Sequence, residues 1–336
     1  MYLRRRYVWL LAILIGSSLG YFIFKSRYTT PYSSKLQAGE NHGGAKTVDA
    51  TQSVATSTKD IVTTEIAAVV RRVLGDQTFK RKPIESIDAN TPFFDIVAPV
   101  TACSSNHYGE FKPHIEDFRK HFPGKKCFFY DLGLSDEQLK EVKNMPDLVY
   151  RKFDYNGYPE HVRNLNNYAW KPLIIQEMLS EFDGTMYFDS SIKFLGNLTN
   201  NVIELMSRHN TGAVFYLVST GHSIITATHP GMLEYFPMIK EGAVKDMLQG
   251  GAVVYINKDE VQRHIMKWVV ICALKNDCIA PPGSTLFCGF NFPRDRFGGC
   301  HRYDQSLQSI LVSNAYNHEQ EKYQYWSKDF AIAARG

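Results

Sequence analysis

The chain has 336 residues, of which 44% are hydrophobic and 13% aromatic, and its formal net charge is +4. This composition is ordinary for a globular protein. Its lysines and arginines form no basic stripe, which argues against a nucleic-acid-binding protein. The aromatic share suits a well-packed domain and a stacking site for a base or a sugar.

The amino terminus carries a membrane-targeting pattern. Arg4–Arg6 precede an apolar run over residues 7–24, which is about as long as the shortest membrane-spanning helices. Because basic residues before such a helix favour an amino terminus in the cytosol, we predict a cytosolic tail (1–6) followed by a transmembrane signal-anchor. The small residues Ser18 and Gly20 leave a cleaved signal peptide as the alternative. Both interpretations place the rest of the chain in the secretory lumen or outside the cell.

Cysteine usage and a glycosylation sequon agree with that location. An even number of cysteines in an oxidising compartment predicts disulfide bonds. The candidates are Cys103, Cys127, Cys272, Cys278, Cys288 and Cys300. The last four are crowded into a short segment, so we expect at least one local bridge there. Asn197 begins an Asn-Leu-Thr sequon and is a predicted glycosylation site. We expect a single-pass type II membrane protein of the Golgi or, alternatively, the endoplasmic reticulum, and a secreted protein if the apolar segment is cleaved.

Residues 25–92 are predicted to form a stem between the membrane and a globular domain over residues 93–336. The stem up to about residue 57 is rich in Ser, Thr, Gly and Ala, and a segment with so few large apolar groups stays flexible. Apolar residues at helical spacing predict a helix over 59–74. That helix could stand in the stem, associate with a second copy, or lean on the domain.

Strands and helices alternate through the first half of the domain. Buried strands are predicted at residues 95–102, 126–130, 148–153 and 185–188, and helices at 112–122, 135–145 and 168–182. Ser135 and Gln138 have the spacing of a capping box at the start of the second helix. Such alternation predicts a mainly parallel sheet covered by helices. Ligands of sheets of this kind bind beyond the carboxyl ends of the strands.

Polar clusters follow three of the predicted strands. They are Thr101–His107, a turn that contains Asp131, and Asp189–Ser191. Because the carboxyl ends of parallel strands meet at one edge of a sheet, we expect these clusters to converge there.

Six segments carry a family resemblance. They read VTACSSNHYGE, FFYDLGLS, RKFDYNGYP, YAWKPLIIQEML, MYFDSSIKFLG and CHRYDQSLQSIL. Together, over residues 93 to about 315, they resemble an uncharacterised family, expanded in nematodes, of type II membrane proteins with a glycosyltransferase-like domain of the GT-A fold. A more distant similarity is to glycosyltransferase family 8. The resemblance implies an α/β fold: a mixed, mainly parallel sheet flanked by helices, preceded by a transmembrane helix and a flexible stem.

The resemblance also implies a nucleotide-sugar donor, a UDP-sugar first, and a glycan or protein acceptor. In family 8, a basic residue opens a helix and the next strand ends in Asp-x-Asp, which holds Mn²⁺ or Mg²⁺. Lys171 and Asp189 to Ser191 fall in those places. Asp189 is therefore the candidate metal ligand, while Ser191 is a weaker ligand than the second Asp that it replaces. The alternatives are a solvated lysine in a first helical turn and an aspartate that caps a turn.

Further donor-binding candidates are Thr101, Ser104, Asp131, Gly250 and Gly251. Asp131 could equally be a turn residue, and the glycine pair a turn before a strand. An Asp-Gln pair at the head of a late helix recurs in transferases of this type, which makes Asp304 and Gln305 the catalytic candidates. Asp304 suits a base, a residue that orients the acceptor, or a helix N-cap.

Other polar residues and motifs give weaker signals. His222 and His229 flank a strand-like segment, SIITAT, and lack partner spacing, so we expect them to be structural. No GxSxG or HExxH motif points to a hydrolase. The first hypothesis is thus a lumenal glycosyltransferase. The alternative, which Ser191 favours, is a catalytically degenerate transferase fold that binds glycans or a partner protein.

Overall fold

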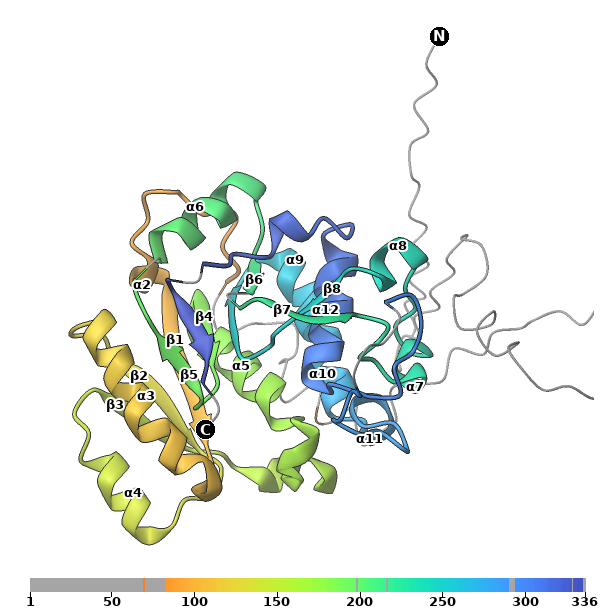
Figure 1. Cartoon of the computed structure of the whole chain (residues 1–336). Coiled ribbons are helices and arrows are strands. Elements are labelled where there is room, and N and C mark those ends of the chain that lie inside the picture. Colours follow the sequence, from red (N-terminus) through yellow and green to blue (C-terminus); the bar gives the residue numbers. More distant parts are fainter. Residues whose placement is uncertain are drawn as a thin grey trace, which may run out of the picture.

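A six-stranded sheet forms the centre of the protein (Figure 1), in a computed structural model that describes residues 69, 82–197, 199–215, 217–289, 294–327 and 329–334. Its strand order is β3-β2-β1-β4-β9-β6. The strands are β1 (Val97–Cys103), β2 (Cys127–Asp131), β3 (Leu148–Lys152), β4 (Gly184–Phe188), β6 (Ala213–Phe215) and β9 (Ala252–Ile256). The first four run parallel, and β9 is antiparallel to both of its neighbours. The predicted mixed, mainly parallel sheet is confirmed.

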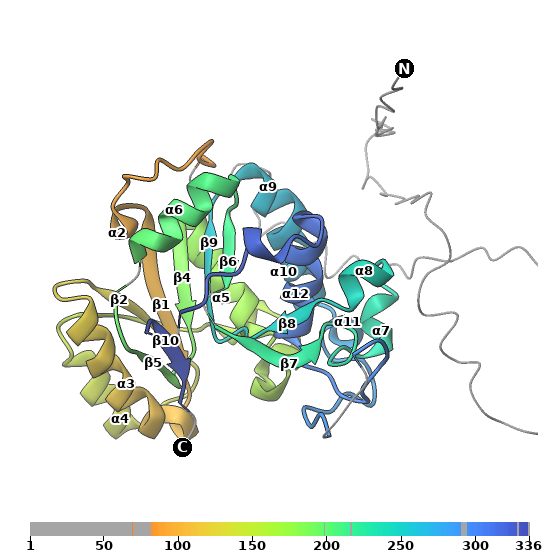
Figure 2. The same cartoon turned by 45° about the horizontal axis from the view of Figure 1, so that its top comes forward.

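Helices cover both faces of this sheet (Figures 1 and 2). They are α2 (Phe93–Ile96), α3 (Tyr108–His121), α4 (Asp136–Lys143), α5 (Trp170–Glu181), α6 (Thr199–His209), α7 (Pro230–Leu233), α8 (Lys240–Ala243), α9 (Asp259–Val261), α10 (Lys267–Ala273), α11 (Asn276–Ile279) and α12 (Asp304–Ala315). A five-residue π-helical segment, Gln262–Met266, joins α9 to α10.

Two hydrophobic cores lie on the two faces of the sheet, because alternate residues of a strand point to opposite sides. In β9, Val253 and Tyr255 belong to the core under α5, α10 and α12. Ala252 and Val254 face the other core, under α3 and α6. Every residue of β9 is buried, as expected of a central strand covered on both faces.

Two short antiparallel pairs extend from this framework. The first joins β7 (Ser219–Ser223) to β8 (Asp246–Leu248), and the second joins β5 (Ile192–Phe194) to β10 (Ala331–Ala333). The backbone N–H of Ala334 donates to the carbonyl of Ser191 at 2.9 Å. The segment after β10 therefore lies directly against the turn that follows β4.

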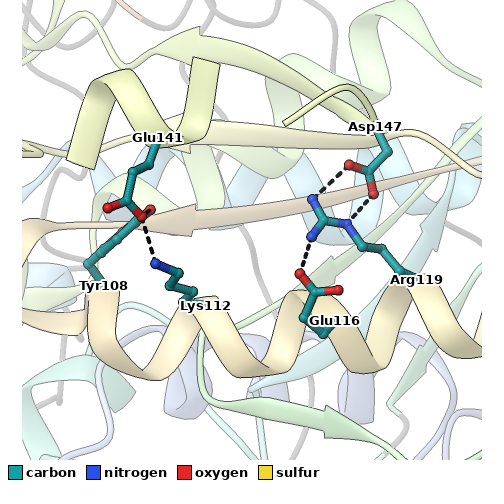
Figure 3. A network of polar contacts seen from close by, with 6 residues as sticks. All are labelled: Tyr108, Lys112, Glu116, Arg119, Glu141 and Asp147. Atoms are coloured by element: carbon teal, nitrogen blue, oxygen red, sulfur yellow. Dashed lines mark hydrogen bonds and ion pairs between the residues drawn. The ribbon is translucent and has the colours of Figure 1, made fainter. Parts of the chain in front are cut away.

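Polar contacts fasten α3 to the segments around α4 and β3 (Figure 3). The guanidinium of Arg119 donates to both carboxylate oxygens of Asp147, at 2.6 and 2.7 Å. Glu141 accepts from the ammonium of Lys112 and from the hydroxyl of Tyr108. Such partly exposed contacts fix the register of α3 more than they stabilise the fold. Glu116, also drawn there, pairs with Arg119.

The predicted elements of the first half are confirmed, with ends displaced by a few residues. The Ser135–Gln138 capping box is present in both of its hydrogen bonds. The segment SIITAT is an exception, because residues 224–227 form a turn after β7. Its hydroxyls bond locally: Ser223 to Thr226, and Thr228 to the carbonyl of Ile224. Such side-chain bonds compete with a strand ladder, and the strand prediction was wrong there.

Most predictions for the amino-terminal region fall outside the described residues, including the tail, the anchor at 7–24 and most of the stem. No helix among the described residues is long and apolar enough to cross a membrane. Val69, the described residue of the predicted helix 59–74, is helical and packs against the core under α5. That contact favours a helix that leans on the domain.

Four of the six cysteines form two local disulfides, Cys272–Cys278 and Cys288–Cys300. This confirms the expected bridging within the crowded segment. Cys103 and Cys127 are instead buried free thiols, contrary to the prediction for them. Cys103 pairs in register with Asp131 at the end of β2, whereas Cys127 begins β2. Four residues of strand separate them by roughly 13 Å, too far for a disulfide.

Candidate active site

A buried lysine joins two of the predicted site residues at the carboxyl end of β4. The Lys171 ammonium lies 2.8 Å from Oδ1 of Asp189 and 3.2 Å from Oδ2 of Asp304. Lys171 stands in the first turn of α5, yet its side chain is only 4% exposed, which rules out a solvated lysine. The Lys171 ammonium therefore joins three elements that are distant in sequence: the start of α5, the start of α12 and the end of β4.

The electrostatics of this cluster follow from burial and from its unequal charges. Burial lowers the pKa of Lys171, but the two carboxylates outweigh burial and raise the net pKa above its ordinary value, so the lysine stays charged. Burial raises the pKa of Asp304, Lys171 lowers it, Asp189 raises it again, and the net shift is upward. One ammonium cannot compensate two carboxylates, so the cluster carries a net negative charge when both are ionised.

Asp189 uses one carboxylate oxygen for contacts within the protein, and its other oxygen lies beside Gly251. Its Oδ1 binds Lys171 and accepts from the hydroxyl of Tyr187 at 3.2 Å. A Cβ at Gly251 would lie 3.0 Å from Oδ2, so the glycine keeps that side open. The Asp189 side chain is 22% exposed, whereas Asp304 is 5% exposed. Among the cluster's groups, Asp189 is thus the one that reaches solvent.

The catalytic candidate Gln305 packs against the glycine pair. Its Oε1 accepts from the backbone N–H of Gly250 at 2.9 Å, and a Cβ at that glycine would lie 3.2 Å from the Gln305 Cβ. The side-chain nitrogen of Gln305 is buried and has no hydrogen-bond partner within the described residues. A buried donor without a partner is costly and is often completed by a ligand or a water.

Asp304 is the first residue of α12 and does not cap the helix, because Tyr303 is the N-cap. Its Oδ2 contacts Lys171 and accepts from the side-chain nitrogen of Gln308 at 3.2 Å. Tyr255 in β9 in turn donates to Oε1 of Gln308 at 2.9 Å. With both partners buried, Asp304 holds Lys171 in place and is not open to solvent as a base would need to be.

The remaining donor-side candidates lie at the ends of β1 and β2. Asp131 accepts from the N–H groups of Gly133 and Leu134, both at 2.8 Å, and from the Tyr150 hydroxyl at 2.9 Å. These contacts are those of a turn residue. Ser104 is nearly buried and donates to the side chain of Asn106. Thr101 lies inside β1 with no exposure and is a core residue.

The sequence motif predicted a divalent metal at Asp189. No group of three or more His, Cys, Asp or Glu side chains within the described residues could hold a metal ion. Ser191 is 5% exposed, and its carbonyl accepts from the chain after β10. Mg²⁺-like ions, however, are commonly held by one or two carboxylates together with substrate phosphates. Asp189, the exposed carboxylate of a cluster with a net negative charge, fits a metal of that kind.

Several site residues had no recognisable sequence motif. Tyr187 stands two residues before Asp189, on the same side of β4, and Gln308 lies one helical turn after Asp304. These spacings could have been used once the two acids were suspected. His114 is a further contact, since its ring lies 2.9 Å from the carbonyl of Ser190. No spacing in the sequence indicated it, because His114 and Ser190 are far apart along the chain.

His229 and His301 make structural contacts, as expected for His229. The backbone N–H of His229 donates to Nδ1 of His301 at 3.1 Å, and Nε2 of His301 donates to the carbonyl of Ile279 at 3.0 Å. His301 is buried, which lowers its pKa to about 4. Its neutral ring therefore links three segments around the entry to α12. His222 lies in β7.

Asn197 is exposed, as a glycosylated residue must be, and its glycosylation stays a prediction.

Comparisons with known proteins found one family model and several solved structures. A family model described as "Protein of unknown function (DUF1647)" matches residues 80–176. No curated protein matches the chain. The galactosyltransferase LgtC, solved with donor and acceptor sugar analogs, is 12% identical with a TM-score of 0.42 and covers 71% of this chain and 87% of its own. The mannosyltransferase Ktr4p from S. cerevisiae is 9% identical with a TM-score of 0.41, covering 80% and 79%.

Core-mannan synthase A from Aspergillus fumigatus, solved in its Mn/GDP form, is 10% identical with a TM-score of 0.40 and covers 76% of this chain and 78% of its own. At these values, the likenesses carry no inference about the reaction. A reaction can therefore be inferred only from the residues of this chain.

Proposed function

We propose that this protein is a glycosyltransferase that moves a sugar from a nucleotide diphosphate sugar to a glycan or protein acceptor in the secretory lumen. The observation that carries the proposal is the charged cluster of Lys171, Asp189 and Asp304 at the carboxyl edge of the sheet. A buried lysine held by two acids costs desolvation free energy. Perturbed groups of this kind concentrate at functional sites.

Each group of the cluster has a task in such a reaction. Lys171 fixes Oδ1 of Asp189, which leaves Oδ2 as the oxygen that would meet the donor. A divalent cation held there with the diphosphate would neutralise charge on the leaving group. Lys171 adds a fixed positive charge close to that position. Asp304 orients Lys171 from the buried side.

Gln305 and the glycine pair would complete the sugar side of the site. The carbonyl of Gly251 accepts from the N–H of Asp189 at 2.7 Å, so the glycine turn borders the carboxylate directly. Because glycine has no side chain, a sugar can approach this backbone closely. The unpartnered nitrogen of Gln305 would then donate to an oxygen of the bound sugar, which satisfies a donor that is otherwise buried alone.

Isothermal titration calorimetry of the full chain in mild detergent tests the proposal. UDP and GDP are titrated with Mn²⁺ and, separately, with EDTA. We expect binding that requires the metal and is at least about tenfold weaker in Asp189→Asn, a loss of one charged ligand worth about 1.4 kcal/mol or more. Glu204→Gln is the matched control, because Glu204 is an exposed acid that pairs with Arg208 on α6.

Two results would change the proposal. If neither diphosphate binds under either condition, the donor-site assignment is wrong. If UDP binds equally with EDTA, the metal is dispensable and the metal part of the proposal is wrong.

A degenerate transferase fold that only binds glycans is the second candidate. The observation in its favour is Ser191, which is neutral and only 5% exposed beside the segment after β10. A second carboxylate is thus missing where the motif needs one. Binding of a sugar without binding of any nucleotide would support this candidate.

A further inference from the structure

Two tyrosines beside the charged cluster have unusual backbone conformations. Tyr168 has a φ of 55° and Tyr303 a φ of 46°, and the other non-glycine residues with positive φ in the described ranges are two asparagines and a histidine. Positive φ is uncommon for non-glycine residues, with Asn and His enriched among them, and is a genuine outlier for a bulky side chain. Such conformations persist only where the surroundings enforce them, and they cluster at ligand sites.

The surroundings of Tyr168 do enforce its conformation. Its neighbour Asn167 is buried, donates to the carbonyl of His161 at 2.7 Å and accepts from the N–H of Ala169 at 3.1 Å. The indole of Trp170 donates to the carbonyl of Leu165. The loop before α5 is therefore fixed on both sides of Tyr168.

Tyr303 is fixed in a comparable way. The N–H of Arg302 lies 3.1 Å from the carbonyl of Ala227 and 3.0 Å from the hydroxyl of Ser306, which itself donates to that carbonyl. The ring of His301, which is fully buried, packs behind Tyr303 with centroids 4.9 Å apart. The Cys288–Cys300 disulfide closes the same segment. These contacts thus hold the backbone on the amino-terminal side of Tyr303 in place.

The two rings pack against each other at a tilt, next to the charged cluster. Their centroids are 6.0 Å apart at an interplanar angle of 48°, and both side chains are partly exposed. The Lys171 ammonium lies 5.7 Å from the centroid of the Tyr168 ring. Burial raises the pKa of Tyr303, so its hydroxyl stays neutral near neutral pH and can both donate and accept. Packing alone would not require two backbone outliers on partly exposed rings.

We propose that Tyr168 and Tyr303 form a carbohydrate-stacking site for the acceptor sugar. A tyrosine offers a rigid apolar face with a polar hydroxyl, which suits the C–H face and the hydroxyls of a pyranose ring. The assignment to the acceptor deepens the proposed transferase function and rests on it.

The sheet order supports the acceptor side. The ends of β1 and β2, where a donor nucleotide would lie, are on one side of β4, and β9 is on the other. Gln305 contacts the glycine turn that leads into β9, and Tyr303 is two residues before it. The tyrosine pair therefore belongs to the β9 side of Asp189, away from the nucleotide end.

Saturation-transfer NMR with the full chain in detergent tests this site. The probes are the methyl glycosides of glucose, galactose, mannose, N-acetylglucosamine and xylose at millimolar concentration, each in the presence of UDP and Mn²⁺. We expect at least one glycoside to receive saturation at the C–H protons of one ring face. Its affinity should fall about three- to tenfold for each lost ring, the range for one aromatic contact.

The variants separate the rings from the backbone. Tyr168→Asn and Tyr303→Gly remove a ring but accept positive φ, so both should bind the glycoside more weakly without a loss of thermal stability. Tyr168→Phe and Tyr303→Phe keep the rings and should retain most of the binding. Trp326→Ala is the matched control, because Trp326 is an aromatic side chain that is 50% exposed in another part of the chain.

Three outcomes would overturn the stacking site. They are no saturation transfer to any glycoside, unchanged binding in both ring-deletion variants, or a large fall of the melting temperature in both, which would assign the rings to packing. UDP binding, measured by calorimetry in the same variants, should stay within about twofold of the wild type. If UDP fails to bind the wild-type protein while the glycoside still binds through these rings, the transferase proposal fails and the sugar site survives.

Discussion

The substitution Lys171→Met removes the charge on which the whole cluster depends. With an effective dielectric constant of 20, contacts of 2.8 and 3.2 Å correspond to gross attractions of about 6 and 5 kcal/mol. Desolvation of the ammonium and repulsion between the two acids offset much of this sum. Breaking a buried pair by removing one partner costs about 3–5 kcal/mol, and we expect a loss of unfolding free energy in that range.

The loss should depend on pH with a definite sign. Burial and Asp189 already raise the pKa of Asp304, and Lys171 opposes them. Without the lysine, that pKa rises further, so the folded variant binds a proton that the unfolded chain releases above about pH 4. Stability of the variant therefore falls as pH rises through this window. The cost of Lys171→Met should be smaller at pH 4.5 than at pH 7.5.

Urea unfolding of the full chain in detergent at both pH values measures this difference. Lys171→Arg keeps the charge and should recover part of the loss. Lys258→Met is the control, because Lys258 is 4% exposed and donates to the carbonyl and side chain of Asn210, which do not titrate. Its acidic neighbour Glu260 lies at 3.9 Å and is 38% exposed, so solvent screens that pair and its pH dependence should be small. Equal costs at the two pH values for Lys171→Met would refute the electrostatic account of the cluster.

Two further predictions concern the surroundings of the cluster. Gly251→Ala places a Cβ 3.0 Å from Oδ2 of Asp189. The overpacking should lower the free energy of unfolding by about 1–3 kcal/mol and weaken Mn²⁺-dependent UDP binding in calorimetry. Wild-type affinity would show that this glycine is not part of the donor site. The pKa of His301 is lowered to about 4, so the folded ring stays neutral while the unfolded chain gains a proton as pH falls below about 6.5. The contribution of His301 to the free energy of unfolding should thus be fully present above that pH and fall by about 3 kcal/mol toward pH 4. His301→Asn should flatten this part of the urea-unfolding profile, and an unchanged profile would assign the acid sensitivity to other groups.

Local sequence patterns were sufficient for the first half of the fold. The four parallel strands, the helices between them and the Ser135 capping box were all predicted, because each depends on short-range periodicity and on residues a few positions apart. The paired glycines before β9 and the helix after Tyr303 were predicted for the same reason. SIITAT failed because its hydroxyls bond within a turn, which the apolar residues in the segment concealed.

The sequence alone determined the alternation of strands and helices along the first half of the chain, the acidic residue after β4 and the residue types of the site. Tertiary structure decided which of these residues meet. Lys171 was predicted as a donor-site residue, with a solvated helix residue as the alternative, and is the buried partner of Asp189 and Asp304. Asp131 lies in a turn and Thr101 in the core. Cys103 and Cys127 stayed apart because strand register separates them. Charge pairing and burial depend on contacts between distant segments, and no local pattern records those contacts.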